Sequence, residues 1–269
     1  MKLEVVNSTI SVNPAIAVSA EHIKREMIIL VTGTTIEPYA QNWKECSHTW
    51  IPILRALGYN VMVAIGDPNL ENYYKIDGSI IWFKAEDTKM GLYDKSIRLP
   101  IKWILEKTDF KYYFRIDSDS FVHPHRFDNM ILHNFEDLRN IQYMGCCHPY
   151  HGWNPNDFTR FFICKKKYMA SGCAYMINRE AMVVAQKNMR IVEDPLDYTI
   201  DDWVLGRAMW ENGIPLLHDS RILFESPHQQ LTVGPCPIPN IAEPTSHLAI
   251  QHYMNGHMFE ALKTLGYAS

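Results

Sequence analysis

The stretch Lys111-Tyr-Tyr-Phe-Arg-Ile-Asp-Ser-Asp-Ser-Phe-Val122 decides the fold of this chain. Its aromatic and apolar run, 112–116, predicts a buried β-strand that stops at two acids, Asp117 and Asp119. Acids at the carboxyl end of a central strand lie where open α/β sheets bind ligands. Paired carboxylates repel each other, and a divalent cation such as Mn²⁺ or Mg²⁺ would relieve that repulsion. Asp-Ser-Asp-Ser is also ordinary turn chemistry, so a simple turn is the alternative.

Composition narrows the class of protein. The 269 residues are 47% hydrophobic and 21% charged, which is ordinary for a soluble globular protein with a sizeable core. The net charge is −4, so the chain lacks the basic excess of a general nucleic-acid or anionic-membrane binder. Its six cysteines include no Cys-x-x-Cys pair, which argues against zinc. Six cysteines in a chain of this length do not demand disulfides, which favours a reducing compartment. No apolar run approaches the ~18 residues of a membrane span.

The order of predicted elements indicates an α/β fold. Strand 27–32, helix 41–57 and strand 60–65 form a βαβ unit, which is typical of a parallel sheet. We therefore predict a mostly parallel, twisted sheet flanked by helices on both faces. Residues 1–25 are predicted to form an N-terminal arm, and 26–269 one domain. Further strands are predicted at 79–83, 111–116, 141–145, 170–177 and 247–252, and further helices at 92–107, 126–138 and 179–188.

Two later stretches carry polar groups that could serve chemistry. Asp201 and Asp202 follow Thr199, which is a good N-cap, at the start of a predicted helix. Acids in a first turn are also ordinary helix stabilisers, which is the alternative interpretation. The irregular stretch 148–170 combines aromatic, amide and imidazole groups that suit a carbohydrate ring, although a packed structural loop would have the same composition.

Three stretches in this order resemble the β-1,3-glycosyltransferases of the Fringe and galactosyltransferase type, glycosyltransferase family 31. They are the acid motif 114–122, the glycine-containing strand 168–177 and the acidic helix start 201–206. The family usually has three consecutive acids in the first motif, and here Ser118 replaces the middle one. Segments 92–98 and 249–254 are similar to two further family motifs. The resemblance, over about 27–266, implies a single GT-A domain with a Rossmann-like, nucleotide-sugar-binding fold.

The resemblance also implies roles for individual residues. Asp119 would ligate Mn²⁺ or Mg²⁺, Asp117 would lie nearer the ribose or a metal-bound water, and His252 would complete the site. His228 is the rival ligand, and a buried strand histidine is the simpler interpretation of His252. The second acid of the helix start, Asp202, would be the catalytic base, with Asp201 in support. The implied donor-binding residues are Thr32, Thr34, Arg98 (with Lys102 as its rival), Asp117, Ser118 and Gly172, and the implied acceptor-binding residues are Trp153 and Tyr168.

The implied reaction is transfer of a sugar, with inversion, from a nucleotide-sugar donor (a UDP-sugar in this family) to an acceptor hydroxyl. The alternatives are a non-catalytic carbohydrate-binding protein and a haloacid-dehalogenase-like phosphatase, which also has Asp-x-Asp after an apolar strand. The family usually carries a membrane anchor and works in the Golgi lumen. Because no anchor is visible, we expect a cytoplasmic microbial or viral relative, with the Golgi lumen as the alternative if an anchor is missing from this sequence.

Overall fold

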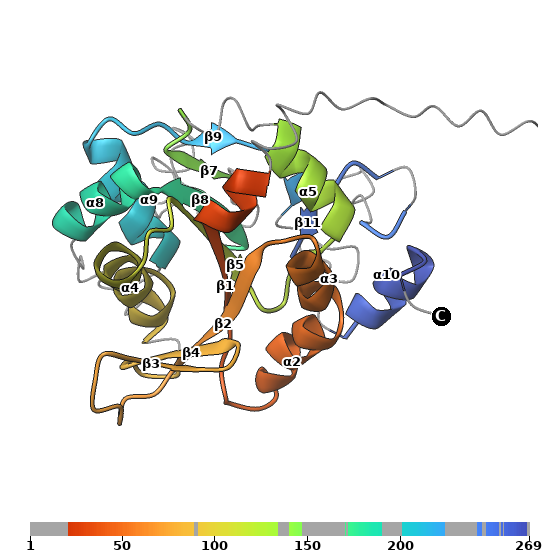
Figure 1. The fold of residues 1–269 in the computed structure, drawn as a ribbon, viewed down its shortest axis with the longest axis horizontal. Helices are drawn as coiled ribbons and strands as arrows, with labels where there is room; N and C mark the ends of the chain where they lie inside the picture. Colours follow the sequence, from red (N-terminus) through yellow and green to blue (C-terminus); the bar gives the residue numbers. More distant parts are fainter. Residues whose placement is uncertain are drawn as a thin grey trace, which may run out of the picture.

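The computed structural model describes residues 21–88, 91–133, 140–146, 170, 172–189, 201–223, 241–243, 246–252, 254 and 256–267. Within these residues an eight-stranded sheet forms the centre of the molecule (Figure 1). The order of its strands is β3 (Tyr74–Asp77), β4 (Ile80–Phe83), β2 (Asn60–Gly66), β1 (Met27–Thr32), β5 (Tyr112–Asp117), β8 (Ala174–Asn178), β7 (Tyr143–Gly145) and β9 (Leu217–His218).

Strand β1 lies in the middle of this sheet, and every one of its residues is buried. It runs parallel to β2 on one side and to β5 on the other, and β2–β4 and β7–β9 are parallel as well. The pairs β3–β4, β5–β8 and β7–β8 are antiparallel. A central strand that is buried on both faces is typical of a parallel sheet covered by helices. The predicted α/β class with a mainly parallel sheet is therefore confirmed.

Helices cover both faces of the sheet and create two hydrophobic clusters. Side chains alternate along a strand, so Ile29 of β1 joins one cluster and its neighbour Ile28 the other. The two clusters are thus the two sides of one sheet, and Figure 1 shows a group of helices on each side. The Ile29 side packs against α2 (Ala40–His48), α3 (Trp50–Ala56), α5 (Pro124–His133) and α10 (Met258–Thr264), and the Ile28 side against η2 (Asp94–Arg98), α4 (Leu99–Lys107), α8 (Arg179–Asn188) and α9 (Asp201–Glu211).

Two predicted helices are interrupted near a proline. The helix predicted at 41–57 divides at Thr49, whose φ of −113° and ψ of −94° are not helical. Pro52 explains the break, because its ring excludes the carbonyl four residues earlier and its nitrogen carries no hydrogen. The helix predicted at 92–107 contains the π-helical turn η2, and α4 restarts with Pro100 in its first turn. Both corrections follow from the same property of proline.

A second sheet of three short strands lies beside the first. It pairs β10 (Ile222–Leu223) with β11 (Ile250–Gln251), and β11 with β6 (Phe121–Val122). The strand predicted at 247–252 is therefore reduced to Ile250–Gln251, and its partner is the short return strand after the acid motif. This sheet joins the late part of the chain to the loop that carries Asp117 and Asp119.

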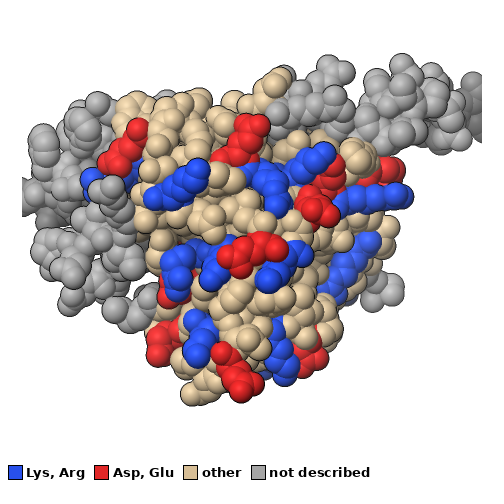
Figure 2. All heavy atoms as spheres, turned by 60° about the vertical axis from the view of Figure 1, so that its left-hand side comes forward, with Lys and Arg blue, Asp and Glu red and all other residues tan. Residues whose placement is uncertain are grey.

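The predicted N-terminal arm is described only in part. Residues 21–26 are helical, and Ile23 packs into the Ile29-side cluster, whereas residues 1–20 lie outside the described residues. No described helix has both the length and the apolar character needed to span a membrane. On the face brought forward in Figure 2, basic and acidic side chains are interspersed, and neither sign dominates.

Candidate functional site

The candidate site lies where the sheet reverses its strand order. The chain builds β1, β2 and β4 in one direction and then returns to place β5 on the other side of β1. Such a reversal opens a crevice at the carboxyl ends of the two strands, which is where α/β proteins bind ligands. Thr32, the last residue of β1, pairs in register with Asp117, the last residue of β5. The two predicted donor-side residues therefore lie side by side at the carboxyl ends of adjacent strands.

A tight loop after β5 presents the acid motif. The Ser120 amide donates to the Asp117 carbonyl over 3.0 Å, and the chain then returns as β6. The loop is held from outside by the amide of Met254, which donates to the Asp119 carbonyl over 2.7 Å. The Cys46 thiol donates to the carbonyl of Ser118 over 3.0 Å. The local sequence makes the turn, and distant segments fix its direction.

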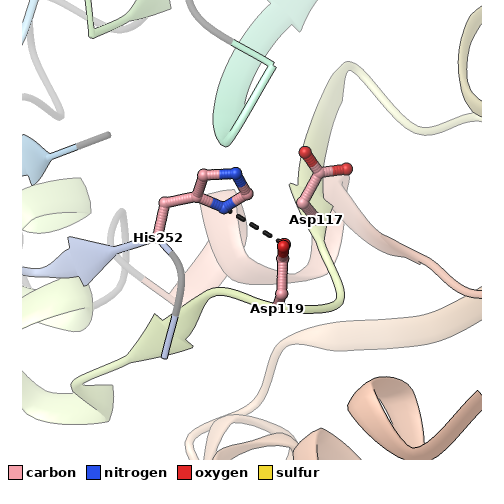
Figure 3. Close-up of side chains that lie close together, drawn as sticks. All are labelled: Asp117, Asp119 and His252. Carbon is pink, nitrogen blue, oxygen red and sulfur yellow. Dashed lines mark ion pairs between the residues drawn. The ribbon is translucent and has the colours of Figure 1, made fainter. Parts of the chain in front are cut away.

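Strand β11 brings His252 to this loop. Gln251 pairs antiparallel with Phe121, so the next position along β11, His252, falls beside Ser120. The His252 Nδ1 atom lies 2.9 Å from Ser120 Oγ and 3.1 Å from Asp119 Oδ1 (Figure 3). One potential ligand atom from each of Asp117, Asp119 and His252 lies within 4.8 Å of the others. The predicted metal ligands are therefore brought together; His228 lies outside the described residues.

The chemistry of this group fits a divalent cation. Two carboxylates and one imidazole are donors that Mn²⁺ or Mg²⁺ accepts, and a cation would offset the repulsion between the acids. Burial raises the pKa of Asp119, but the adjacent His252 outweighs that effect and holds the pKa below its ordinary value. Burial raises the pKa of Asp117 to about 7, against the attraction of Arg115. Asp119 is thus ionised without help, whereas a cation would favour the ionised form of Asp117.

Arg115 is a site residue that the sequence analysis missed. It is 1% exposed, and its Nη2 atom lies 2.6 Å from Asp117 Oδ1 and 3.1 Å from Asp201 Oδ2. Residues two apart on a strand share a face, which is why Arg115 and Asp117 meet. The signal in the sequence was a charged residue inside an otherwise apolar strand, two positions before an acid of opposite sign.

The two acids at the start of α9 have different surroundings. The Oδ2 atom of Asp201 accepts a hydrogen bond of 2.7 Å from the Ser96 hydroxyl in addition to its contact with Arg115. Asp202 is 8% exposed, and its Oδ1 atom has no hydrogen-bond partner among the described residues. Burial, reinforced by the charge of Asp201, raises the pKa of Asp202 to about 8. The dipole of a helix favours an ionised carboxylate in its first turn, and burial outweighs that effect here.

Gly172 lies at the point where these elements meet. A Cβ atom at this position would lie 3.3 Å from Arg115 Nη1, 3.3 Å from Asp202 Oδ2 and 3.8 Å from Asp117 Oδ2. The Gly172 amide also donates a hydrogen bond to Asp202. A side chain here would press on the arginine and on the acid of α9. The sequence analysis named Gly172 for the donor, and the structure places it between the strand-end acids and the helix-start acids.

The remaining predicted donor residues have other contacts. The Thr34 hydroxyl donates to the Asp87 carbonyl over 3.1 Å. Arg98 is exposed and pairs with Asp94 over 2.5 Å, while its rival Lys102 lies over the Tyr73 ring. Trp153 and Tyr168, predicted for the acceptor, lie outside the described residues. The structure thus brings together the strand-end, glycine and helix-start residues, and directs Arg98 and Lys102 to partners of their own.

A second buried ion pair, also missed, organises the loops beside the crevice. Lys95 Nζ lies 2.7 Å from Asp87 Oδ1, and the amide and hydroxyl of Thr35 both donate to Asp87 Oδ2. Burial raises the pKa of Asp87, but the bonds from Lys95 and Thr35 outweigh it, and the pKa lies below its ordinary value. Asp87 therefore ties the loop after β1 to η2, the element that also carries Ser96.

Comparison with known proteins identifies no family for this chain. The sequence matches no protein-family model and no curated protein. Among solved structures, the chain is similar to the crystal structure of a glycosyltransferase involved in the glycosylation of the major capsid of PBCV-1. The TM-score is 0.47 and the identity 12%, over 90% of this chain and 100% of that chain. At this identity and TM-score the likeness assigns neither a family nor a function, and both must be inferred from the chemistry of the site.

Proposed function

We propose that this chain is a metal-dependent glycosyltransferase that moves a sugar from a nucleotide-sugar donor to an acceptor hydroxyl with inversion. The observation that carries the proposal is one cluster at the strand-reversal crevice, with a cation-type donor set on one side and buried acids on the other. The donor set is Asp117, Asp119 and His252, and the acids are Asp201 and Asp202. A carbohydrate-binding module has no need for a buried acid beside a cation site.

The metal side of the cluster suits a diphosphate leaving group. Asp117, Asp119 and His252 would hold the cation at the end of β5. A divalent cation bound there supplies Lewis-acid stabilisation of the charge that develops on the departing diphosphate. Thr32, at the end of β1, is the register partner of Asp117, at the end of β5, so both lie at the same edge of the sheet as these ligands. The mainly parallel α/β architecture is also consistent with a GT-A-like domain that binds its nucleotide there.

The acid side suits removal of a proton from the acceptor. A general base works best when its pKa lies near the working pH, and burial brings the pKa of Asp202 to about 8. The free Oδ1 atom of Asp202 would accept the proton of the attacking hydroxyl, and Asp201 would stay bound to Ser96 and Arg115. The family resemblance adds the finer expectations of a UDP-hexose donor, a β-1,3 linkage and Mn²⁺.

The test measures the binding of nucleotide sugars in the presence of Mn²⁺, with thermal unfolding or calorimetry as the readout. At 100-fold over its Kd, a donor should stabilise the fold by about 2.7 kcal/mol. Asp119→Ala should abolish Mn²⁺-dependent binding, whereas Asp77→Ala, an exposed acid on the edge strand β3, should not. Undiminished Mn²⁺-dependent binding by Asp119→Ala would disprove the metal site. Binding without any donor cleavage would indicate a carbohydrate-binding protein, and release of phosphate from a simple ester would indicate a phosphatase.

A further inference from the structure

Arg115 contacts both acidic halves of the site. Its Nη2 atom lies 2.6 Å from Asp117 on β5 and 3.1 Å from Asp201 on α9. In the described part of the chain, these are the ion pairs through which β5 and the first turn of α9 meet. Asp201 is itself 4% exposed in its side chain, so this contact lies in the interior.

The rest of the guanidinium group is packed rather than hydrogen-bonded, because Nε and Nη1 are buried and have no hydrogen-bond partner among the described residues. Tyr175 pairs with Arg115 across β5 and β8, and the guanidinium carbon lies 5.6 Å from the centre of the tyrosine ring. Nη1 faces Gly172, where a Cβ atom would lie only 3.3 Å away. Burial lowers the pKa of Arg115, but Asp117 and Asp201 outweigh it, so the pKa lies above its ordinary value and the charge is fixed. The planar group therefore has a defined orientation.

We propose that Arg115 is a positioning residue that holds the Asp117 and Asp201 carboxylates together and so fixes the start of α9 against the metal-binding strand end. This inference rests on the proposed function. The cation side and the base side of the reaction come from different elements, and a displacement of about 1 Å can cost about 100-fold in rate. Both carboxylates are contacted by the same nitrogen, Nη2. Arginine suits the task because the planar guanidinium holds that nitrogen in a fixed place, whereas the ammonium of lysine is a point charge on a flexible stem.

The test compares Arg115→Lys with Arg179→Lys. Arg179 donates to the backbone carbonyls of Leu105, Thr108 and Phe110. It follows Asn178, which pairs with Tyr112 at the other end of β5, so it is a matched arginine remote from the acids. Three quantities are measured: the thermal midpoint, Mn²⁺ affinity in the presence of UDP by electron paramagnetic resonance, and steady-state UDP release from the donor found in the wild-type screen.

Arg115→Lys should lower kcat about 10–100-fold, the usual effect of losing a group that orients a site residue. The KM of the donor should change less, because the lysine leaves the crevice itself intact. Arg179→Lys should lower the thermal midpoint and leave kcat and Mn²⁺ affinity at wild-type values. In the double variant Arg115→Lys/Asp201→Asn, the loss should be smaller than the two single losses combined, since both changes remove the contact between Arg115 and Asp201.

Several outcomes would overturn the role of Arg115. They are a folded Arg115→Lys protein with wild-type kcat, a kcat loss equal to that of Arg179→Lys, and additive losses in the double variant. If Arg115→Lys does not fold, Gly172→Ala keeps every charge and presses a methyl group on both Arg115 Nη1 and Asp202 Oδ2. Wild-type kcat in that variant would also overturn the proposal. If the wild-type protein neither binds Mn²⁺ nor releases a nucleoside diphosphate from any donor in the screen, the proposed function fails, and the role of Arg115 fails with it.

Discussion

The four aspartates of the site differ in their pKa values and in their hydrogen-bond partners, because their surroundings differ. Asp119 lies beside His252 and has a lowered pKa, while Asp117 and Asp202 have pKa values of about 7 and about 8, mainly because of burial. Asp201 is bound to both Ser96 and Arg115. Groups whose environments separate their pKa values are suited to separate tasks in acid–base chemistry. These differences are consistent with the proposed roles of Asp119 as a metal ligand, Asp202 as the base and Asp201 as its support.

The first prediction concerns the base. Asp202→Asn keeps the shape of the side chain but removes the proton acceptor, so transfer should fall by ~10²–10⁴-fold. Donor affinity should hold, because Asp202 lies outside the group that could bind the metal. The measurement pairs turnover with donor titration. Asp201→Asn is the matched control: near-normal turnover in the Asp202 variant and a collapse in the Asp201 variant would move the base one residue back.

The sequence predicted those site residues whose signal lies in their own motif. Asp117 and Asp119 end an apolar run, and the family order directed attention to His252, which the structure places 3.1 Å from Asp119. Arg115 was missed because a charge in an apolar strand predicts a buried partner without identifying it, and one of its partners, Asp201, comes from a distant helix. Asp87 was missed because its partners are distant in the sequence: Thr35 lies in the loop after β1, and Lys95 lies in η2.

At the scale of elements, local patterns succeeded where the element depends on its own residues. Helix α8 has the predicted bounds, and it begins where Asn178 accepts a hydrogen bond from the Ala181 amide. Strand β11 depends instead on a partner about 130 residues earlier, so its two paired residues could not be separated from the apolar run around them. The π-helical turn η2 also depends on more than its own residues, because it precedes a proline and contacts α9 and β1.

The second prediction tests whether the small sheet positions the metal site. Ile250 is fully buried in β11, two residues before His252, and pairs with Val122. Ile250→Ala should cost about 2–5 kcal/mol of unfolding free energy, the usual range for this change in a core. It should also weaken Mn²⁺ binding in the folded protein, because β11 holds His252 against the acid loop. Denaturant unfolding and Mn²⁺ titration are the measurements.

The matched control for this prediction is Ile81→Ala. Ile81 is equally buried, but it lies in β4, which pairs with β2 and β3 rather than with the acid loop. This variant should lose a similar unfolding free energy and keep wild-type Mn²⁺ affinity. Equal Mn²⁺ affinities for the two variants would show that β11 has no special part in placing His252.

At the scale of the whole molecule, the site costs the fold stability in the absence of a cation. A compact α/β sandwich buries apolar side chains on both faces of one sheet, yet at one edge it also buries carboxylates. Uncompensated buried charge is unfavourable, and an acid in that position keeps its proton instead. A cation at this edge would therefore act on stability as well as on catalysis, and the size of its effect should depend on pH.

The third prediction concerns how the stability of the protein, with and without Mn²⁺, depends on pH. Asp117 and Asp202 have folded-state pKa values of about 7 and about 8, above their ordinary 3.8, so the folded protein binds more protons than the unfolded chain between these values. Their stabilising contribution is full below pH 3.8 and is lost as the pH rises through 7 and 8. His123, whose pKa is lowered from 6.5 to about 4, acts in the opposite direction below pH 6.5. The metal-free protein should therefore lose stability most clearly between pH 6.5 and 8.

Mn²⁺ binds ionised carboxylates, so its stabilising effect should grow over the same range. Thermal midpoints at both ends of this range, with and without Mn²⁺, measure it. Asp202→Asn should flatten the metal-free decline, and a decline of unchanged slope in that variant would contradict the raised pKa of Asp202.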